Sequence, residues 1–99
     1  MKYVMFQVDQ EHTGKINTLI KDDMISRQSI LIRDAHALDI KGTETYLKIE
    51  GSDEGVKRAE TLAKELGFKK LDEKKAREIN EKIEQQEDSA ATGMGMIFD

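Results

Sequence analysis

Residues 45–67, TYLKIEGSDEGVKRAETLAKELG, decide how this chain is expected to fold. At the start, Leu47 and Ile49 alternate with polar or aromatic neighbours, which is the pattern of a half-buried strand. A glycine then turns the chain, and Ser52 can cap a helix whose apolar positions share one stripe: Val56, Ala59, Leu62, Ala63 and Leu66. Gly67 stands where many helices end on a glycine. The stretch therefore predicts a strand that turns directly into a helix.

Similar patterns predict the other elements of the fold. Short β-prone runs predict strands at residues 3–8, 28–33 and 68–71. Helical spacing predicts a helix over about residues 14–25, with Thr13 as its N-cap and apolar positions at Ile16, Leu19, Ile20 and Met24. The connection 34–44 is too long for a tight hairpin, so it is either a wide loop or contains a helical turn around residues 35–38.

The order of these elements is strand, helix, strand, strand, helix, strand. Two helices that each cross between strands lie on one face of an antiparallel sheet, so residues 1–71 are expected to form a ferredoxin-like α+β domain with a four-stranded sheet. The element order over residues 3–71 and the segment YLKIEGSDEGVKRAETLAKEL resemble small ferredoxin-like regulatory domains of the ACT type. That resemblance implies a regulatory binding role and dimers joined sheet to sheet or edge to edge.

Two further segments follow the predicted domain. Residues 72–88 predict an appended, charged helix that begins at an Asp72 cap and buries little, because its apolar stripe is limited to Ala76, Ile79 and Ile83. Residues 89–99 are expected to form a flexible Gly/Met-rich tail with a candidate partner-docking group of Met94, Met96, Ile97 and Phe98. Three outcomes stay open for this tail: folding back on its own domain, docking to a neighbouring subunit or another protein, and disorder.

Composition excludes several classes of protein. The chain of 99 residues has no cysteine, which excludes disulfides and thiol chemistry and suits the cytoplasm. A net charge of −4 without a basic arm disfavours nucleic acid as a partner. No apolar run is long enough to span a bilayer, so no membrane association is expected. The sequence contains no cofactor signature and no catalytic motif.

Two polar clusters are the candidates for site chemistry. Asp9 and His12 follow the first strand, and Arg33, Asp34 and His36 lie where the second strand ends. Carboxylates and imidazoles are metal ligands and acid–base groups, and a ferredoxin-like fold can bring these two strand ends together. Neither cluster has a diagnostic ligand spacing, so no metal or catalytic residue is assigned.

The function expected from sequence is therefore a small, non-catalytic binding or regulatory module. Its partner is a small ligand or a protein, and self-association as a homodimer is expected because the second face of the sheet, with Tyr3, Met5 and Tyr46, lacks a predicted cover. The alternative is a small metal-binding protein or enzyme that uses the loops of His12 and His36.

Overall fold

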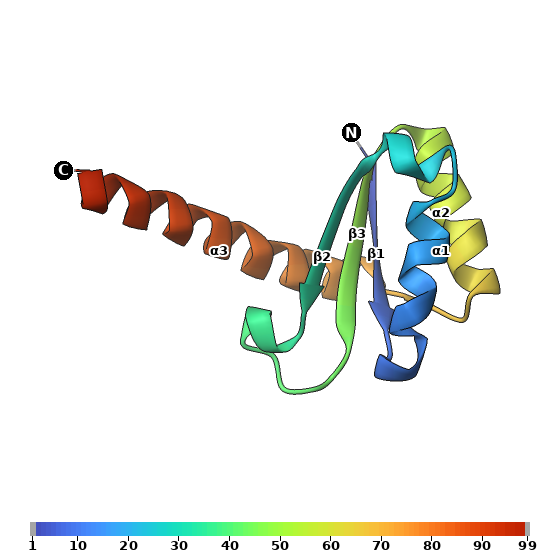
Figure 1. The fold of residues 1–99 in the computed structure, drawn as a ribbon, viewed down its shortest axis with the longest axis horizontal. Helices are drawn as coiled ribbons and strands as arrows, with labels where there is room; N and C mark the ends of the chain where they lie inside the picture. Colours follow the sequence, from blue (N-terminus) through green and yellow to red (C-terminus); the bar gives the residue numbers. More distant parts are fainter. Residues whose placement is uncertain (1, 99) are drawn as a thin grey trace.

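The computed structural model describes residues 2–98, with side chains for residues 2–86, and has the predicted element order (Figure 1). Its strands are β1 (Lys2–Val8), β2 (Ser29–Asp34), β3 (Thr45–Gly51) and β4 (Lys69–Lys70). Its α-helices are α1 (Ile16–Ile20), α2 (Asp53–Glu65) and α3 (Glu73–Phe98). Short 3-10 helices lie in the connections: η1 (Gln10–Lys15), η2 (Ile25–Arg27) and η3 (His36–Leu38).

The four strands form one antiparallel sheet in the order β2-β3-β1-β4, which confirms the ferredoxin-like α+β prediction. Strand β1 pairs with β3 from Lys2↔Gly51 to Val8↔Thr45. On its other side β1 pairs with β4 only at Phe6↔Lys70 and Gln7↔Lys69. Strands β2 and β4 are thus the two edges, and β1 is incompletely covered on the β4 side.

Helices α1 and α2 pack on one face of the sheet, as predicted. Because side chains alternate along a strand, Val4, Phe6 and Val8 all point to this face and enter a core with Leu47, Ile49, Leu19, Ile25, Val56, Ala59, Ala63 and Phe68. The Ser52 hydroxyl accepts a hydrogen bond from the Gly55 N–H at 3.1 Å, which confirms the predicted helix cap. Gly67 has a φ of 82°, the left-handed conformation that a glycine stop requires.

The helix predicted over residues 14–25 is wrong in its extent. The backbone instead forms η1, a five-residue α1 and η2, because the Asp22 carboxylate accepts hydrogen bonds from Met24 N–H and Ile25 N–H and starts a new turn. Thr13 is not an N-cap, since its hydroxyl donates to the Gln10 carbonyl. The connection 34–44 contains the helical turn that was one of its two alternatives.

The expectation that the third helix buries little is also wrong. Helix α3 crosses the second face of the sheet, where Ala76, Ile79 and Ile83 are 7%, 1% and 3% exposed. With Leu38 from η3, they form a second core over Met5, Tyr46, Ala35 and Leu71. Three apolar positions suffice because their spacing of three and four residues puts them on one stripe, and each buried Ile contributes about 1.5–3 kcal/mol.

The chain therefore covers both faces of its own sheet, and the expectation of an uncovered second face is wrong. Lys48 Nζ lies 2.6 Å from Asn80 Oδ1, a hydrogen bond that ties the middle of β3 to α3. Helix α3 runs on to Phe98, beyond its predicted end near residue 87. The division into a helix at 72–88 and a tail at 89–99 stays a prediction, since the side chains of that tail lie outside the described part of the chain.

Candidate functional site

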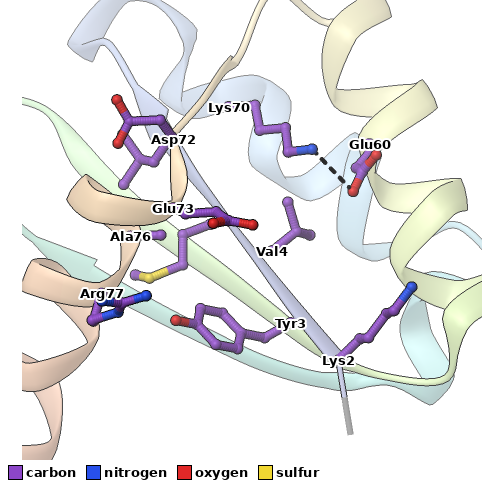
Figure 2. A pocket seen from close by; sticks show the side chains of 11 residues that line it. Lys2, Tyr3, Val4, Glu60, Lys70, Asp72, Glu73, Ala76 and Arg77 are labelled. Carbon is purple, nitrogen blue, oxygen red and sulfur yellow. Dashed lines mark ion pairs between the residues drawn. The ribbon is translucent and has the colours of Figure 1, made fainter.

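A groove of about 690 Å³ lies at the sheet edge where β4 stops. Figure 2 shows that its side chains come from β1, from α2, from the end of β4 and from the first turns of α3. Its floor is apolar, and a mixture of charged side chains and one tyrosine forms its rim. The apolar lining residues are Val4, Met5, Leu71 and Ala76, and the polar ones are Lys2, Tyr3, Glu60, Lys70, Asp72, Glu73 and Arg77.

The groove exists because the chain leaves the sheet early. The Leu71 N–H still donates to the Met5 carbonyl at 3.0 Å, which continues the β1–β4 ladder by one residue. Asp72 then starts α3, and its Oδ1 accepts a hydrogen bond from the Lys75 N–H at 2.8 Å, which confirms the predicted cap. The first residues of β1 therefore lie beside no strand on this side, with α2 on one face and α3 on the other.

Most charged groups at the rim already have partners. Lys70 Nζ lies 3.3 Å from Glu60 Oε1, the ion pair drawn in Figure 2. Lys2 Nζ lies 3.6 Å from Asp53 Oδ1, and Asp72 is occupied by its helix cap. Within residues 2–86, Arg77 has no carboxylate within 4 Å, so its guanidinium is available to an anionic group of a ligand.

The predicted polar residues lie at the opposite end of β1, in two separate places. The pairing Val8↔Thr45 and Thr45↔Asp34 puts the ends of β1 and β2 at the same end of the sheet, with β3 between them. From there the η1 and η3 turns diverge (Figure 1). The His12 ring lies against Gly67 at the end of α2, whereas η3 packs against α3 through Leu38.

The residues of the two predicted polar clusters lie in separate local environments. Asp9 is exposed and precedes η1, and Asp34 Oδ1 accepts a hydrogen bond from Thr45 Oγ1 at 3.1 Å. Arg33 Nη1 donates to the Ile32 carbonyl at 2.9 Å, and His36 is exposed.

His12 lies in the other turn, where its Nδ1 atom is buried without a hydrogen-bond partner. Over the described residues, no three His, Asp or Glu side chains converge as a metal site would require.

Among the residues whose side chains the structure describes, Tyr46 has the most strongly altered titration. Its side chain is 2% exposed beneath the second core, and its hydroxyl donates to Glu44 Oε1 at 3.0 Å. Burial, reinforced by that hydrogen bond and the Glu44 charge, raises the pKa of Tyr46 to about 12. The phenol is therefore protonated at neutral pH and anchors the turn before β3 rather than lining a cavity.

Comparisons with known proteins give no further assignment. No protein-family model, curated protein or solved structure matches the chain. Across residues 2–98, no helix combines the length and apolar character needed to cross a membrane. The partner-docking prediction for Met94, Met96, Ile97 and Phe98 concerns side chains outside the described residues.

Sequence reasoning missed the groove. Its residues are scattered over β1, α2, the end of β4 and α3, and none belongs to a motif. The one local signal was the short run FKKL between Gly67 and Asp72, which is too brief to cover the seven residues of β1. A last strand much shorter than its neighbour leaves an open edge, and this is where the groove lies.

Proposed function

We propose that the protein is a non-catalytic binding module whose ligand is a small molecule held in the groove beside β1. The observation that carries the proposal is the apolar floor under a charged rim, in a hollow of about 690 Å³. Small-molecule sites typically have about 300–1,000 Å³ and combine apolar walls with a few polar groups. A regulatory binding role is also what the resemblance to ACT-type domains implies.

The chemistry of the lining favours a ligand with an apolar body and one anionic group. Val4, Met5 and Leu71 are each at most 5% exposed, so the floor is fixed by the cores on either side of the sheet. Tyr3, which is 36% exposed, offers an aromatic face and a hydroxyl at the rim. Arg77 is the group best suited to bind a carboxylate or phosphate there.

The states of the polar groups favour a binding role over catalysis. Among the residues whose side chains the structure describes, the lining holds no histidine or serine, Asp72 caps α3, and Glu60 is paired with Lys70. General acid–base or nucleophilic catalysis needs a group and its activating partner within hydrogen-bonding distance of one reacting atom. The groove presents no such pair, so its polar groups are suited to recognition.

The proposal is tested by screening a collection of anionic metabolites by thermal shift. A ligand that binds only the folded state raises the melting temperature, and its stabilisation grows with the logarithm of one plus the ratio of its concentration to its dissociation constant. Any compound that binds wild type is then measured against Arg77→Ala and against Arg27→Ala, a matched control because Arg27 is exposed and remote from the groove.

Arg77→Ala is expected to weaken binding by about tenfold or more, while Arg27→Ala binds like wild type. Equal binding by both variants would place the ligand elsewhere and contradict the proposed site.

A further inference from the structure

The start of β1 has no strand beside it on the β4 side. Strand β4 pairs with β1 at Phe6 and Gln7, and the ladder then ends with the hydrogen bond of 3.0 Å from the Leu71 N–H to the Met5 carbonyl. Residues 2–4 of β1 have an open edge beyond this bond, and all three line the ligand groove. The groove therefore contains unpaired strand backbone as well as side chains.

Tyr3 is the residue whose backbone groups face the groove. The Met5 carbonyl points toward β4, and in an antiparallel ladder the direction of the backbone groups alternates along the strand. The N–H and C=O groups of Tyr3 therefore point to the same side as that carbonyl, whereas Lys2 and Val4 direct theirs to β3. Among residues 2–86, no other backbone group is hydrogen-bonded to Tyr3 on this side. Tyr3 thus offers one donor and one acceptor to a ligand.

The groove has room for one extended chain between two helices. Helix α2 bounds it on one face of the sheet through Glu60, and the first turns of α3 bound it on the other face through Ala76 and Arg77 (Figure 2). Leu71 occupies the position beside Met5 and closes that end. The edge of a second folded sheet carries helices of its own, which would meet α2 and α3 here. A short peptide has no such layers, and it can supply the hydrogen bonds of a strand.

We propose that the ligand of the groove is a short peptide that adds a strand antiparallel to residues 2–4 of β1. This inference rests on the proposed function, because it takes the groove as the ligand site, and it specifies the class of ligand. In an antiparallel pair, one residue exchanges both backbone hydrogen bonds with the residue opposite, so one peptide residue satisfies both groups of Tyr3. The open edge is long enough for about three peptide residues.

The peptide residue that pairs with Tyr3 is expected to be acidic. Directly opposed residues project to the same face of a sheet, and Tyr3 projects to the α3 face, where Lys48 Nζ lies 5.0 Å from the centre of its ring. Arg77 lines the groove on this face, and within residues 2–86 it has no carboxylate within 4 Å. A carboxylate opposite Tyr3 therefore lies on the same side as the Arg77 guanidinium, which can bind it.

The peptide residues before and after the acidic one are expected to be apolar. They project to the α2 face, beside Val4 and Lys2. Val4 is 4% exposed and belongs to the first core, and the Lys2 ammonium already has Asp53 as a partner at 3.6 Å. Isoleucine suits both positions because it is apolar and favours extended backbone.

The amino end of the peptide is expected to be free. An antiparallel strand runs from the Val4 position to the Lys2 position, so its first residue lies where Leu71 leaves the sheet. Asp72 and Glu73 line the groove there. Asp72 caps α3, whereas Glu73 has no Lys or Arg partner within 4 Å among residues 2–86. An ammonium group at this end can therefore pair with the Glu73 carboxylate.

Amide NMR of the full chain, titrated with the tripeptide Ile-Glu-Ile-amide, tests the strand pairing. Saturable shifts of the Tyr3 and Val4 amides are expected at millimolar peptide. The Hα of Val4 is expected to show a nuclear Overhauser effect to the Hα of the first isoleucine, because the Cα atoms of a non-hydrogen-bonded pair lie about 4.5 Å apart. No saturable shift of these amides, or binding without this contact, would overturn the inference.

Methylated peptides test whether the backbone carries the binding. Methylation of the glutamate nitrogen removes the donor to the Tyr3 carbonyl and is expected to weaken binding by at least about tenfold. Methylation of the second isoleucine nitrogen is the matched control, because that N–H points away from β1, and this peptide is expected to bind like the parent. Equal effects of the two methyl groups would show that the peptide does not pair as a strand.

Charge variants test the side-chain assignments. Arg77→Ala is expected to weaken the binding of Ile-Glu-Ile-amide by about tenfold and to leave that of Ile-Gln-Ile-amide nearly unchanged. Glu73→Gln is expected to weaken the free-amine peptide by about threefold relative to its acetylated form. Both side chains are exposed, and circular dichroism verifies that both variants fold. Equal losses for the charged and the neutral peptides would overturn these assignments.

A parallel titration with 1-anilinonaphthalene-8-sulfonate separates this inference from the proposed function. If the dye binds in the groove and depends on Arg77 while the peptide does not bind, the groove is a ligand site and the peptide inference is wrong. If neither binds, the proposed function is wrong as well. Saturable binding of both at the same amides supports both.

Discussion

Arg58 binds Asp22 through two nitrogens, with Nη2 at 2.9 Å and Nε at 3.0 Å from the same Oδ1 atom. The other carboxylate oxygen accepts the Met24 and Ile25 N–H groups. The Asp22 side chain thus connects the turn before η2 to helix α2. The Arg58 hydrogen bond, helped by the backbone donors, holds the pKa of Asp22 below its ordinary value.

This arrangement predicts how stability depends on acid. Because the folded-state pKa of Asp22 is lowered, its contribution to stability is present above the unfolded-state pKa of about 3.9 and is lost as pH falls through the folded value. Asp22→Asn is expected to lower stability at pH 7 and to reduce its loss between about pH 5 and pH 2. Urea unfolding across this range measures the effect. Asp23→Asn, an exposed neighbour, is the control, and identical pH profiles for the two variants would contradict the prediction.

The raised pKa of Tyr46 predicts a transition at alkaline pH. In a Tyr3→Phe background Tyr46 is the remaining tyrosine, so ultraviolet absorbance follows its ionisation alone. We expect a midpoint at about pH 12. Since this folded pKa is raised above the unfolded value of about 10, the contribution of Tyr46 to stability is present below pH 10 and is lost as pH rises through 12. A midpoint near 10 while the chain is still folded would show that Tyr46 is not buried.

Ile79 tests the role of α3. Its side chain is 1% exposed between the helix and the sheet, so Ile79→Ala is expected to cost about 2–5 kcal/mol of unfolding free energy. Glu78→Ala, on the exposed side of the same helix turn, is expected to change stability by less than about 0.5 kcal/mol. Denaturant unfolding measures both. Small and equal losses of unfolding free energy in both variants would show that α3 is an appended helix that buries little.

Deleting residues 92–99 tests the role of the tail. Helix α3 is anchored by Ile83 and Gln86 and then continues beyond β2 (Figure 1). If the tail docks to a neighbouring subunit or another protein, deleting residues 92–99 is expected to weaken that association in sedimentation experiments and to leave far-ultraviolet circular dichroism of the remaining chain intact. A large loss of stability in a chain that stays monomeric would instead support folding back on its own domain.

The two histidine loops give a further prediction. Because η1 and η3 diverge, Zn²⁺ is not expected to shift the imidazole NMR signals of His12 and His36 together in a saturable way. A saturating shift of both signals at one metal ion per chain would revive the metal-site hypothesis. His12→Gln would then separate joint ligation from binding at His36 alone.

Local signals explain why much of the fold was predictable. Ser52 and Gly67 set the ends of α2 by a side-chain cap and by a left-handed φ, and both effects act within a few residues. Alternation likewise placed Leu47 and Ile49 in the core. The extent of the first helix was not predicted because the Asp22 carboxylate starts a new turn, and Asp22 is also held by Arg58, which lies 36 residues away on another helix.

The candidate site was less predictable because it depends on tertiary arrangement. The stripe of Ala76, Ile79 and Ile83 was visible, but its burial depends on how α3 crosses the sheet. That same direction, together with the shortness of β4, opens the groove. By contrast, Asp9, His12 and Asp34 were selected as candidates by residue type alone. In the fold, the turns that follow the two strands diverge.

The most direct test of the proposed function is an amide NMR titration with 1-anilinonaphthalene-8-sulfonate, a probe with an apolar body and one anionic group. Binding in the groove predicts saturable shifts of the amides of Val4, Met5, Leu71 and Ala76, and loss of these shifts in Arg77→Ala. The amides around His12 and His36 are expected to stay unchanged. Shifts that cluster at the histidine turns, or that spread evenly over the surface, would contradict the assignment of the groove as the ligand site.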